Sequence, residues 1–267
     1  MRPLLLLVLA AAVVLTAVFA LQRRLLYFPD RYTEPEAIAR AARLGLAPWR
    51  APGGALIGFR SASAGTGTPR GRVLVLHGNA GSALDRIPYA DALARLGVEV
   101  ALVEYPGYGA RAGAPTLASL TAAAVEAVDA AGREGGPVWL LGESLGSGVA
   151  ARAAAERPDA VRGIVLVTPF AELAEVARLH YGPVASALLR DRFAPVRELA
   201  TFRRPVVVLV AGRDEVVGPE QGRALFRALP GPKWLVEQPG ATHSGLDLAD
   251  GAFWAEAIGF LETGAAR

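Results

Sequence analysis

The stretch PVWLLGESLGSG, residues 137–148, is the part of the sequence that decides the fold. A solid apolar run leads into a Gly-x-Ser-x-Gly pattern, and the residues that follow favour a helix. Gly142 and Gly146 leave room for a tight turn from a strand into a helix, and such a turn lifts the hydroxyl of Ser144 above the edge of a sheet. The stretch therefore predicts a buried strand over 138–141, Ser144 at a sharp turn, and a helix over 145–156.

Similar short apolar runs recur on both sides of this stretch, at Val73–Leu76, Val98–Val103, Gly163–Val167, Val206–Val210 and Trp234–Val236. Solid runs of four to six apolar residues are typical of strands that are buried on both faces of a parallel sheet. Helix-like stretches separate them, at Asp85–Leu96, Leu117–Ala131, Glu220–Leu229 and Ala252–Leu261. This order predicts a three-layer α/β fold with a mostly parallel central sheet.

One interval departs from this rhythm. Residues 168–205 form an interval about twice as long as the others, and Pro183 and Pro195 divide it. We expect a small cap insertion over about 169–204, lying above the carboxyl edge of the sheet, where sites in parallel sheets are found. Residues 61–70, SASAGTGTPR, are interpreted as a loop.

The composition argues against several classes of function. The net charge is +3, but the basic residues are scattered and nearly all are arginine, which does not favour nucleic acid as a partner. The chain has no cysteine, which excludes disulfides, zinc–thiolate sites and a thiol nucleophile. A G-x-G-x-x-A pattern at 146–151 follows a central strand and lacks a later acid for a ribose, so no nucleotide is expected. We therefore predict neither a cofactor nor a metal.

Residues 4–21, LLLLVLAAAVVLTAVFAL, carry no charge. As a helix this segment is about 27 Å long at about 1.5 Å per residue, close to the roughly 30 Å of a bilayer core. We therefore predict a signal anchor (a single transmembrane helix) within residues 1–24 and one globular domain over 25–267. The predicted location is a bacterial inner membrane, with the side of the domain left open. A cleaved signal peptide is the alternative, and it predicts a secreted or periplasmic protein.

A serine hydroxyl needs a base within hydrogen-bond reach, and that base needs an orienting acid. The chain has three histidines, and only His243 comes after both Ser144 and a suitable acid, the chain order expected at this kind of turn. Asp214 follows the apolar run at 206–210 and is the best match for the acid. Its neighbour Glu215 stays open as the alternative. We predict Ser144, Asp214 and His243 as a catalytic triad.

The sequence HGNAG at 77–81 follows another predicted strand. An oxyanion hole needs two backbone N–H groups aimed at the developing negative charge. We predict that these come from Leu145, directly after the serine, and from Asn79. His77 and Gly78 are then structural residues that hold this loop in shape.

Taken together, the motifs HGNAG, EYPGYG (104–109), GESLG, TPF (168–170), AGRDEVV (211–217) and GATHS (240–244) resemble those of the α/β-hydrolase superfamily. With LLYFPD at 25–30, the chain looks most similar to small membrane-anchored serine hydrolases. The resemblance implies cofactor-independent hydrolysis of an ester, thioester or amide. Ser147 and Gly218 depart from the family pattern, the first beside the predicted nucleophile and the second near the predicted acid.

The expected function is therefore that of a serine hydrolase of the carboxylic-ester type, acting through an acyl-enzyme on a small-molecule acyl or lipid-like ester. A serine peptidase is one alternative, and a catalytically silent, membrane-tethered binding module is another. Apolar residues of the cap either line an acyl site or pack within the cap; these are Leu179, Tyr181, Leu188 and Leu189.

Overall fold

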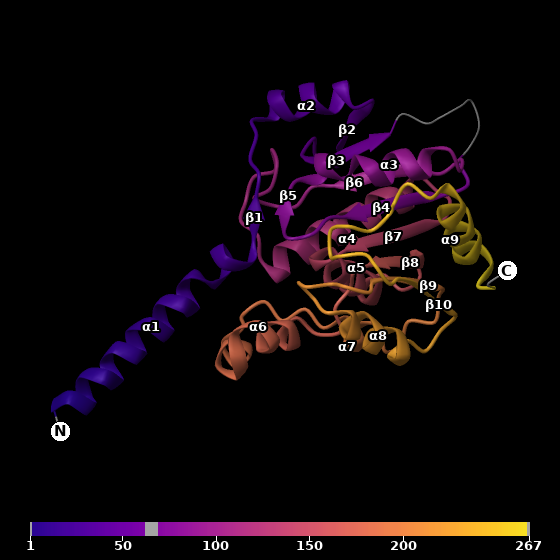
Figure 1. Cartoon of the computed structure of the whole chain (residues 1–267). Helices are drawn as coiled ribbons and strands as arrows, with labels where there is room; N and C mark the ends of the chain where they lie inside the picture. Colours follow the sequence, from indigo (N-terminus) through magenta and orange to yellow (C-terminus); the bar gives the residue numbers. More distant parts are fainter. Residues whose placement is uncertain (1, 62–68, 266–267) are drawn as a thin grey trace.

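The computed structural model describes residues 2–61 and 69–265 (Figure 1). Its centre is an eight-stranded sheet with the strand order β10-β9-β8-β7-β4-β6-β3-β2. In chain order the strands are β2 (Leu46–Arg50), β3 (Leu56–Ser61), β4 (Arg72–Leu76), β6 (Glu99–Val103), β7 (Val138–Glu143), β8 (Val161–Val167), β9 (Val206–Ala211) and β10 (Lys233–Gln238). Neighbours from β10 to β6 are parallel, which confirms the predicted sheet.

Helices cover both faces of this sheet, so the predicted three-layer α/β fold is confirmed. One face packs against α2 (Glu34–Arg43), α3 (Ile87–Ala94) and α9 (Gly251–Thr263). The other packs against α4 (Leu117–Arg133), α5 (Leu145–Glu156) and α8 (Pro219–Ala228). The valine-rich strand β9 is buried along its whole length, as expected for a strand covered on both faces.

The hairpin of β2 and β3 was not predicted. Both of its strand pairings are antiparallel, β2 with β3 and β3 with β6. Pro48 lies within β2, which is tolerated because β2 is the edge strand of the sheet. Gly58 lies within β3, where an added Cβ would be 2.2 Å from the carbonyl oxygen of Leu102. The loop predicted over 61–70 lies mostly outside the described residues.

The N-terminal segment forms helix α1 (Arg2–Leu26), which projects away from the sheet (Figure 1). No helix among residues 2–61 and 69–265 is both long enough and apolar enough to cross a membrane. The structure therefore does not support the transmembrane helix predicted over residues 4–21. The cellular location derived from that segment stays a prediction.

The predicted cap insertion contains α6 (Leu173–Leu188) and α7 (Pro195–Glu198). Helix α6 is interrupted at Gly182, which has a φ of 81° and is followed by Pro183. The proline therefore kinks a helix that the sequence had indicated as separate pieces. Leu179 and Tyr181 are exposed on this helix, whereas Leu188 and Leu189 are partly buried.

Asp191, in the loop after α6, joins the cap to the end of α1. Its carboxylate accepts hydrogen bonds from Arg23 at 2.9 Å and from the hydroxyl of Tyr27 at 3.1 Å. It also accepts the backbone N–H of Leu117 at 3.2 Å. Asp191 is 4% exposed, so each of these donors offsets part of the cost of burying its charge. The end of α1, the start of α4 and the cap therefore meet at one carboxylate.

Candidate active site

Ser144 lies at the carboxyl end of β7, between the strand and α5. Its backbone has φ 50° and ψ −115°, in the left-handed half of the map that side-chain-bearing residues rarely occupy. An added Cβ on Gly142 would lie 2.5 Å from the carbonyl oxygen of Gly146, and one on Gly146 would lie 1.9 Å from that of Leu76. Glycine is therefore required on both sides of the serine, and we call residues 142–146 the elbow.

The structure brings Ser144, His243 and Asp214 together in one hydrogen-bonded chain. His243 Nε2 is 3.0 Å from Ser144 Oγ, and His243 Nδ1 is 2.8 Å from Asp214 Oδ2. The three residues come from the elbow, the loop after β10 and the loop after β9, and all three positions lie at the carboxyl edge of the parallel strands. This arrangement allows His243 to accept the serine proton while Asp214 orients the imidazole.

Asp214 is the acid that contacts the imidazole, and Glu215 is not. Glu215 accepts the backbone N–H of His243 at 3.2 Å instead. Burial raises the pKa of Asp214, but hydrogen bonds from His243 and from the N–H groups of Val217 and Val216 outweigh it and hold the pKa below its usual value. Gly218 starts the next helix with a φ of 86° and does not disturb these bonds.

Two backbone N–H groups near Ser144 are free of backbone partners. Among the described residues, neither the N–H of Leu145 nor that of Asn79 donates to a backbone carbonyl outside regular elements, and Leu145 is the first residue of α5. First-turn N–H groups of a helix have no acceptor within the helix. Both predicted oxyanion donors are thus available, and their role stays a prediction.

His77 fixes the peptide plane that carries the Asn79 N–H. Its Nδ1 is 2.8 Å from the carbonyl oxygen of Gly78, and because a carbonyl only accepts, Nδ1 must carry the proton. The Gly78–Asn79 peptide is trans, so its C=O and N–H point in opposite directions. Holding the carbonyl toward His77 therefore turns the N–H of Asn79 away from it. This geometry supports the structural role predicted for His77 and Gly78.

Sequence reasoning missed the residues that hold His77 in turn. Glu104 is fully buried at the end of β6, with Oε1 3.5 Å from His77 Nε2 and 3.1 Å from the N–H of Ala83. The ring of Tyr105 packs at a tilt against the imidazole, with ring centroids 4.1 Å apart, and its hydroxyl donates to the carbonyl of His77. The position of EYPGYG directly after a strand was the available signal, because strand ends are where a site gathers its side chains.

The segment directly after α1 also holds the oxyanion loop. Strand β1 (Phe28–Pro29) pairs in parallel with β5 (Ala80–Gly81). The N–H of Phe28 donates to the carbonyl of Asn79 at 2.8 Å, and the Asn79 side chain donates to the carbonyl of Leu26 at 2.9 Å. We call residues 26–31 the strap, since they lie across the loop that carries a predicted oxyanion donor.

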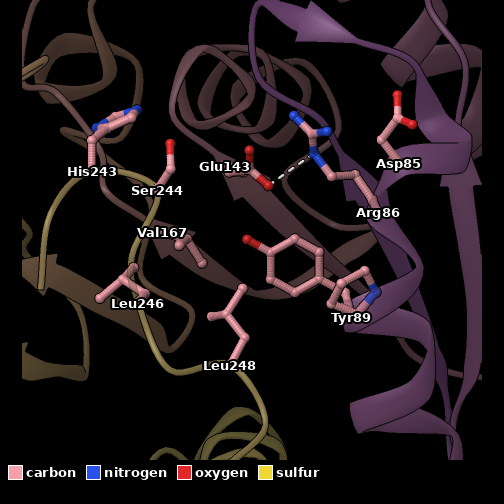
Figure 2. A pocket seen from close by; sticks show the side chains of 10 residues that line it. Asp85, Arg86, Tyr89, Glu143, Val167, His243, Ser244, Leu246 and Leu248 are labelled. Atoms are coloured by element: carbon pink, nitrogen blue, oxygen red, sulfur yellow. Dashed lines mark ion pairs between the residues drawn. The ribbon is translucent and has the colours of Figure 1, made fainter.

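A cavity of about 280 Å³ lies beside His243 and between the 3-10 helix η1 (Ala83–Arg86), α3 and the loop 243–248 (Figure 2). We call it the side cavity. Arg86 and Glu143 form an ion pair on its wall, with Nε and Oε2 2.9 Å apart. A second lining carboxylate, Asp85, binds Arg40 at 2.6 Å. Both lining carboxylates are therefore neutralised by an arginine.

The remaining histidine binds a backbone carbonyl. His180 lies on α6, and its Nε2 is 2.7 Å from the carbonyl oxygen of Val216, so it is bound to the loop after Asp214. Within the described ranges, no three side chains of the metal-binding types His, Cys, Asp and Glu converge on a common point.

Ser147, which departs from the family pattern, is fully buried in α5. Among the described residues its hydroxyl oxygen finds no hydrogen-bond partner. The backbone N–H of Ser147 donates to the carbonyl of Ser144 at 2.9 Å, so the first turn of the helix forms normally.

Comparison with known proteins places this chain in a family. Residues 67–196 match the family described as serine aminopeptidase, S33. An uncharacterised protein of Mycobacterium tuberculosis is 34% identical over 267 residues, covering 94% of this chain and 90% of that protein. An esterase of Pyrococcus furiosus has the same fold, with a TM-score of 0.64 at 16% identity, covering 91% of this chain and 99% of that one. A monoacylglycerol lipase of Paleococcus ferrophilus also has this fold, with a TM-score of 0.57 at 23% identity. The match covers 74% of this chain and 97% of the lipase.

Proposed function

On the premise that this chain belongs to the α/β-hydrolase family, we propose that it is a serine hydrolase that cleaves carboxylic esters through an acyl-enzyme on Ser144. The observation that carries the proposal is the unbroken chain from Ser144 Oγ through His243 to Asp214, with separations of 3.0 and 2.8 Å. Such a chain is what converts a weakly nucleophilic hydroxyl into an attacking group.

In the proposed reaction Ser144 Oγ attacks the ester carbonyl while His243 Nε2 accepts its proton. Asp214 keeps the Nδ1 proton in place and stabilises the charged imidazolium. The N–H groups of Leu145 and Asn79 stabilise the oxyanion. His243 then donates its proton to the departing alkoxide, and water repeats the sequence on the acyl-enzyme to release the acid.

Esters are preferred over amino-terminal peptides for an electrostatic reason. An aminopeptidase must bind the positively charged α-amine of its substrate, which calls for an unpaired carboxylate near the nucleophile. The two carboxylates that line the side cavity, Glu143 and Asp85, are each paired with an arginine, and that of Glu215 accepts the backbone N–H of His243. The esterase and the monoacylglycerol lipase that share the fold support an acyl or lipid-like ester as the substrate.

Aminopeptidase activity is the second candidate, because the matching family is described by that activity. The two are separated by assaying p-nitrophenyl esters from acetate to palmitate beside leucine p-nitroanilide. We expect kcat/KM for the best ester to exceed that for the anilide by about 100-fold or more, together with covalent labelling by a fluorophosphonate. A preference for the anilide would establish the peptidase. If neither substrate were hydrolysed and the fluorophosphonate did not label the protein, the protein would be a binding module with a hydrolase fold and no catalytic activity.

The pH dependence of ester hydrolysis should report one ionisation. Asp214 has its pKa held below the usual carboxyl value of about 4, so it stays charged at mildly acidic pH. The acid therefore contributes no ionisation of its own to the profile above about pH 4.5. We expect the acidic limb of log kcat/KM to have a slope of no more than one down to that pH, measured in buffers of constant ionic strength. A slope of two would mean that the acid titrates together with the base.

The lowered pKa also has a consequence for stability. A carboxyl whose pKa is lower in the folded state favours folding above its unfolded pKa, and the contribution disappears as pH falls through the folded pKa. Asp214 therefore stabilises the fold at neutral pH and loses this contribution as pH falls below its unfolded pKa and through the lower folded one.

Truncation should separate the strap from the helix before it. A chain that begins at Gln22 keeps residues 26–31 and the Arg23–Asp191 ion pair, and its kcat should stay within about twofold of the full chain. A chain that begins at Tyr32 should lose about tenfold or more in kcat, because the Asn79 carbonyl loses the Phe28 N–H and the loop is less well positioned. Active sites are counted by fluorophosphonate titration. Full kcat in the shorter chain would show that the strap does not position the loop.

A further inference from the structure

The side cavity has one polar wall and one apolar wall. Figure 2 shows the Arg86–Glu143 pair on one side and Leu246 and Leu248 facing it from the loop after His243. The hydroxyl of Tyr89 is turned toward Glu143. Burial, with the charge of Glu143, raises the pKa of Tyr89 well above its ordinary value, so this hydroxyl stays a neutral donor.

The cavity is connected to the elbow on its polar side. A Cβ on Gly78 would lie 3.3 Å from Glu143 Oε1, 3.4 Å from an Nη of Arg86 and 3.6 Å from Ser144 Cβ. The ion pair therefore lies next to both the oxyanion loop and the serine. His243, which donates a proton to the departing alkoxide in the proposed function, is also part of the lining. A group that leaves toward His243 therefore has the side cavity, which is partly open to solvent, as an adjacent space.

We propose that the side cavity binds the alcohol part of the ester, and that this alcohol is a small, uncharged polyol. The assignment rests on the proposed function and names the substrate class of the same site. Polyol hydroxyls donate to the carboxylate of Glu143 and accept from the guanidinium of Arg86. The C–H face of the polyol packs on Leu246 and Leu248.

Charge and size both limit the ligand. The opposite charges of Arg86 and Glu143 cancel, and Asp85 is cancelled by Arg40, so an ionic headgroup gains no unpaired counter-charge here. The volume of about 280 Å³ lies at the small end of ligand cavities. At about 30 Å³ per water-sized group, it holds roughly nine such groups. A three- or four-carbon polyol fits this space, whereas a long alkyl alcohol would extend out of it.

The test keeps the acyl group constant and varies the alcohol. We compare kcat/KM for four butyryl esters, those of glycerol, 1-propanol, choline and glycolate, which are respectively polar, apolar, cationic and anionic. The full chain should prefer the glycerol ester over the propyl ester by about tenfold or more, because hydrogen bonds to charged groups contribute about that factor. Both charged esters should fall below the glycerol ester.

Variants then link the preference to the ion pair. Glu143→Gln keeps the side-chain shape and removes the charge, and Arg86→Met removes the other partner. Each should lower the glycerol-to-propyl ratio by about fivefold or more. The matched control is Asp129→Asn, which breaks the half-buried Arg157–Asp129 pair beyond the far end of α5 and should leave the ratio unchanged.

The outcomes are distinct. An active enzyme whose glycerol-to-propyl ratio is near one overturns the polyol assignment, as does a ratio that survives both variants. A preference for the choline or glycolate ester would assign the cavity to an ion and overturn it as well. An enzyme that hydrolyses none of the four esters and resists fluorophosphonate would instead overturn the proposed function itself.

Discussion

The Ser144→Ala variant is expected to fold like the wild type and to lose about 10⁴- to 10⁶-fold in kcat for ester hydrolysis. Alanine keeps the Cβ and therefore the same backbone demands, while the Oγ that lies 3.0 Å from His243 Nε2 is lost. The residual rate would come from the oxyanion donors and from substrate binding alone. The measurement is kcat on the preferred p-nitrophenyl ester, with thermal unfolding to verify the fold.

Ser147→Ala is the matched control for this variant. Ser147 lies three residues further along and is fully buried, and among the described residues its hydroxyl oxygen has no partner. Its removal should leave kcat within about twofold and should not lower the melting temperature, because no hydrogen bond is lost. If Ser144→Ala kept most of the wild-type rate while remaining folded, the nucleophile would have to be sought elsewhere.

Asp214→Asn is expected to lower kcat by about 10³- to 10⁴-fold at neutral pH. Oδ1 of Asp214 accepts two backbone N–H groups, those of Val216 and Val217. In the variant the amide oxygen must therefore take the Oδ1 position, 2.9 Å from His243 Nδ1, and the NH₂ group replaces Oδ2, which now lies at 2.8 Å. An NH₂ group donates, so it opposes the proton on Nδ1, and the negative charge that stabilises the imidazolium is lost.

This prediction is sharpest when Asp214→Asn is compared with Glu215→Gln. Glu215 contacts only the backbone N–H of His243 within the triad, and its amide oxygen can still accept that bond. We expect Glu215→Gln to stay within about threefold of the wild-type kcat. The reverse ranking of the two variants would transfer the role of the acid to Glu215.

The parallel part of the fold could be predicted because its strands are covered on both faces. A run such as β9, Val206–Ala211, is apolar throughout, and such runs stand out from their surroundings. The β2–β3 hairpin lies at the sheet edge, where only Leu46 and Trp49 of β2 are buried and Pro48 weakens the strand pattern. An edge strand of this kind is stabilised mainly by pairing with the neighbouring strand. A local sequence pattern does not reveal that pairing.

The candidate site also has a part that could be predicted from the sequence and a part that could not. Ser144, Asp214 and His243 each follow a predicted strand, so topology alone placed them at one edge, and the structure brings them within hydrogen-bond distance. Glu104 and the strap could not be assigned from the sequence, because their contacts with the oxyanion loop join segments that are far apart in the chain. The transmembrane helix predicted over residues 4–21 is not supported among the described residues.

At Ser144 the residue that catalysis needs is not the residue that would make the fold most stable to heat. A side-chain-bearing residue held at φ 50° and ψ −115° costs the fold about 1–3 kcal/mol, whereas glycine adopts such angles readily. One exchange to glycine would therefore relieve the backbone and remove the hydroxyl together. A mutant library of this protein screened for thermal tolerance without a turnover assay would enrich that exchange, and its most robust members would be its inactive ones.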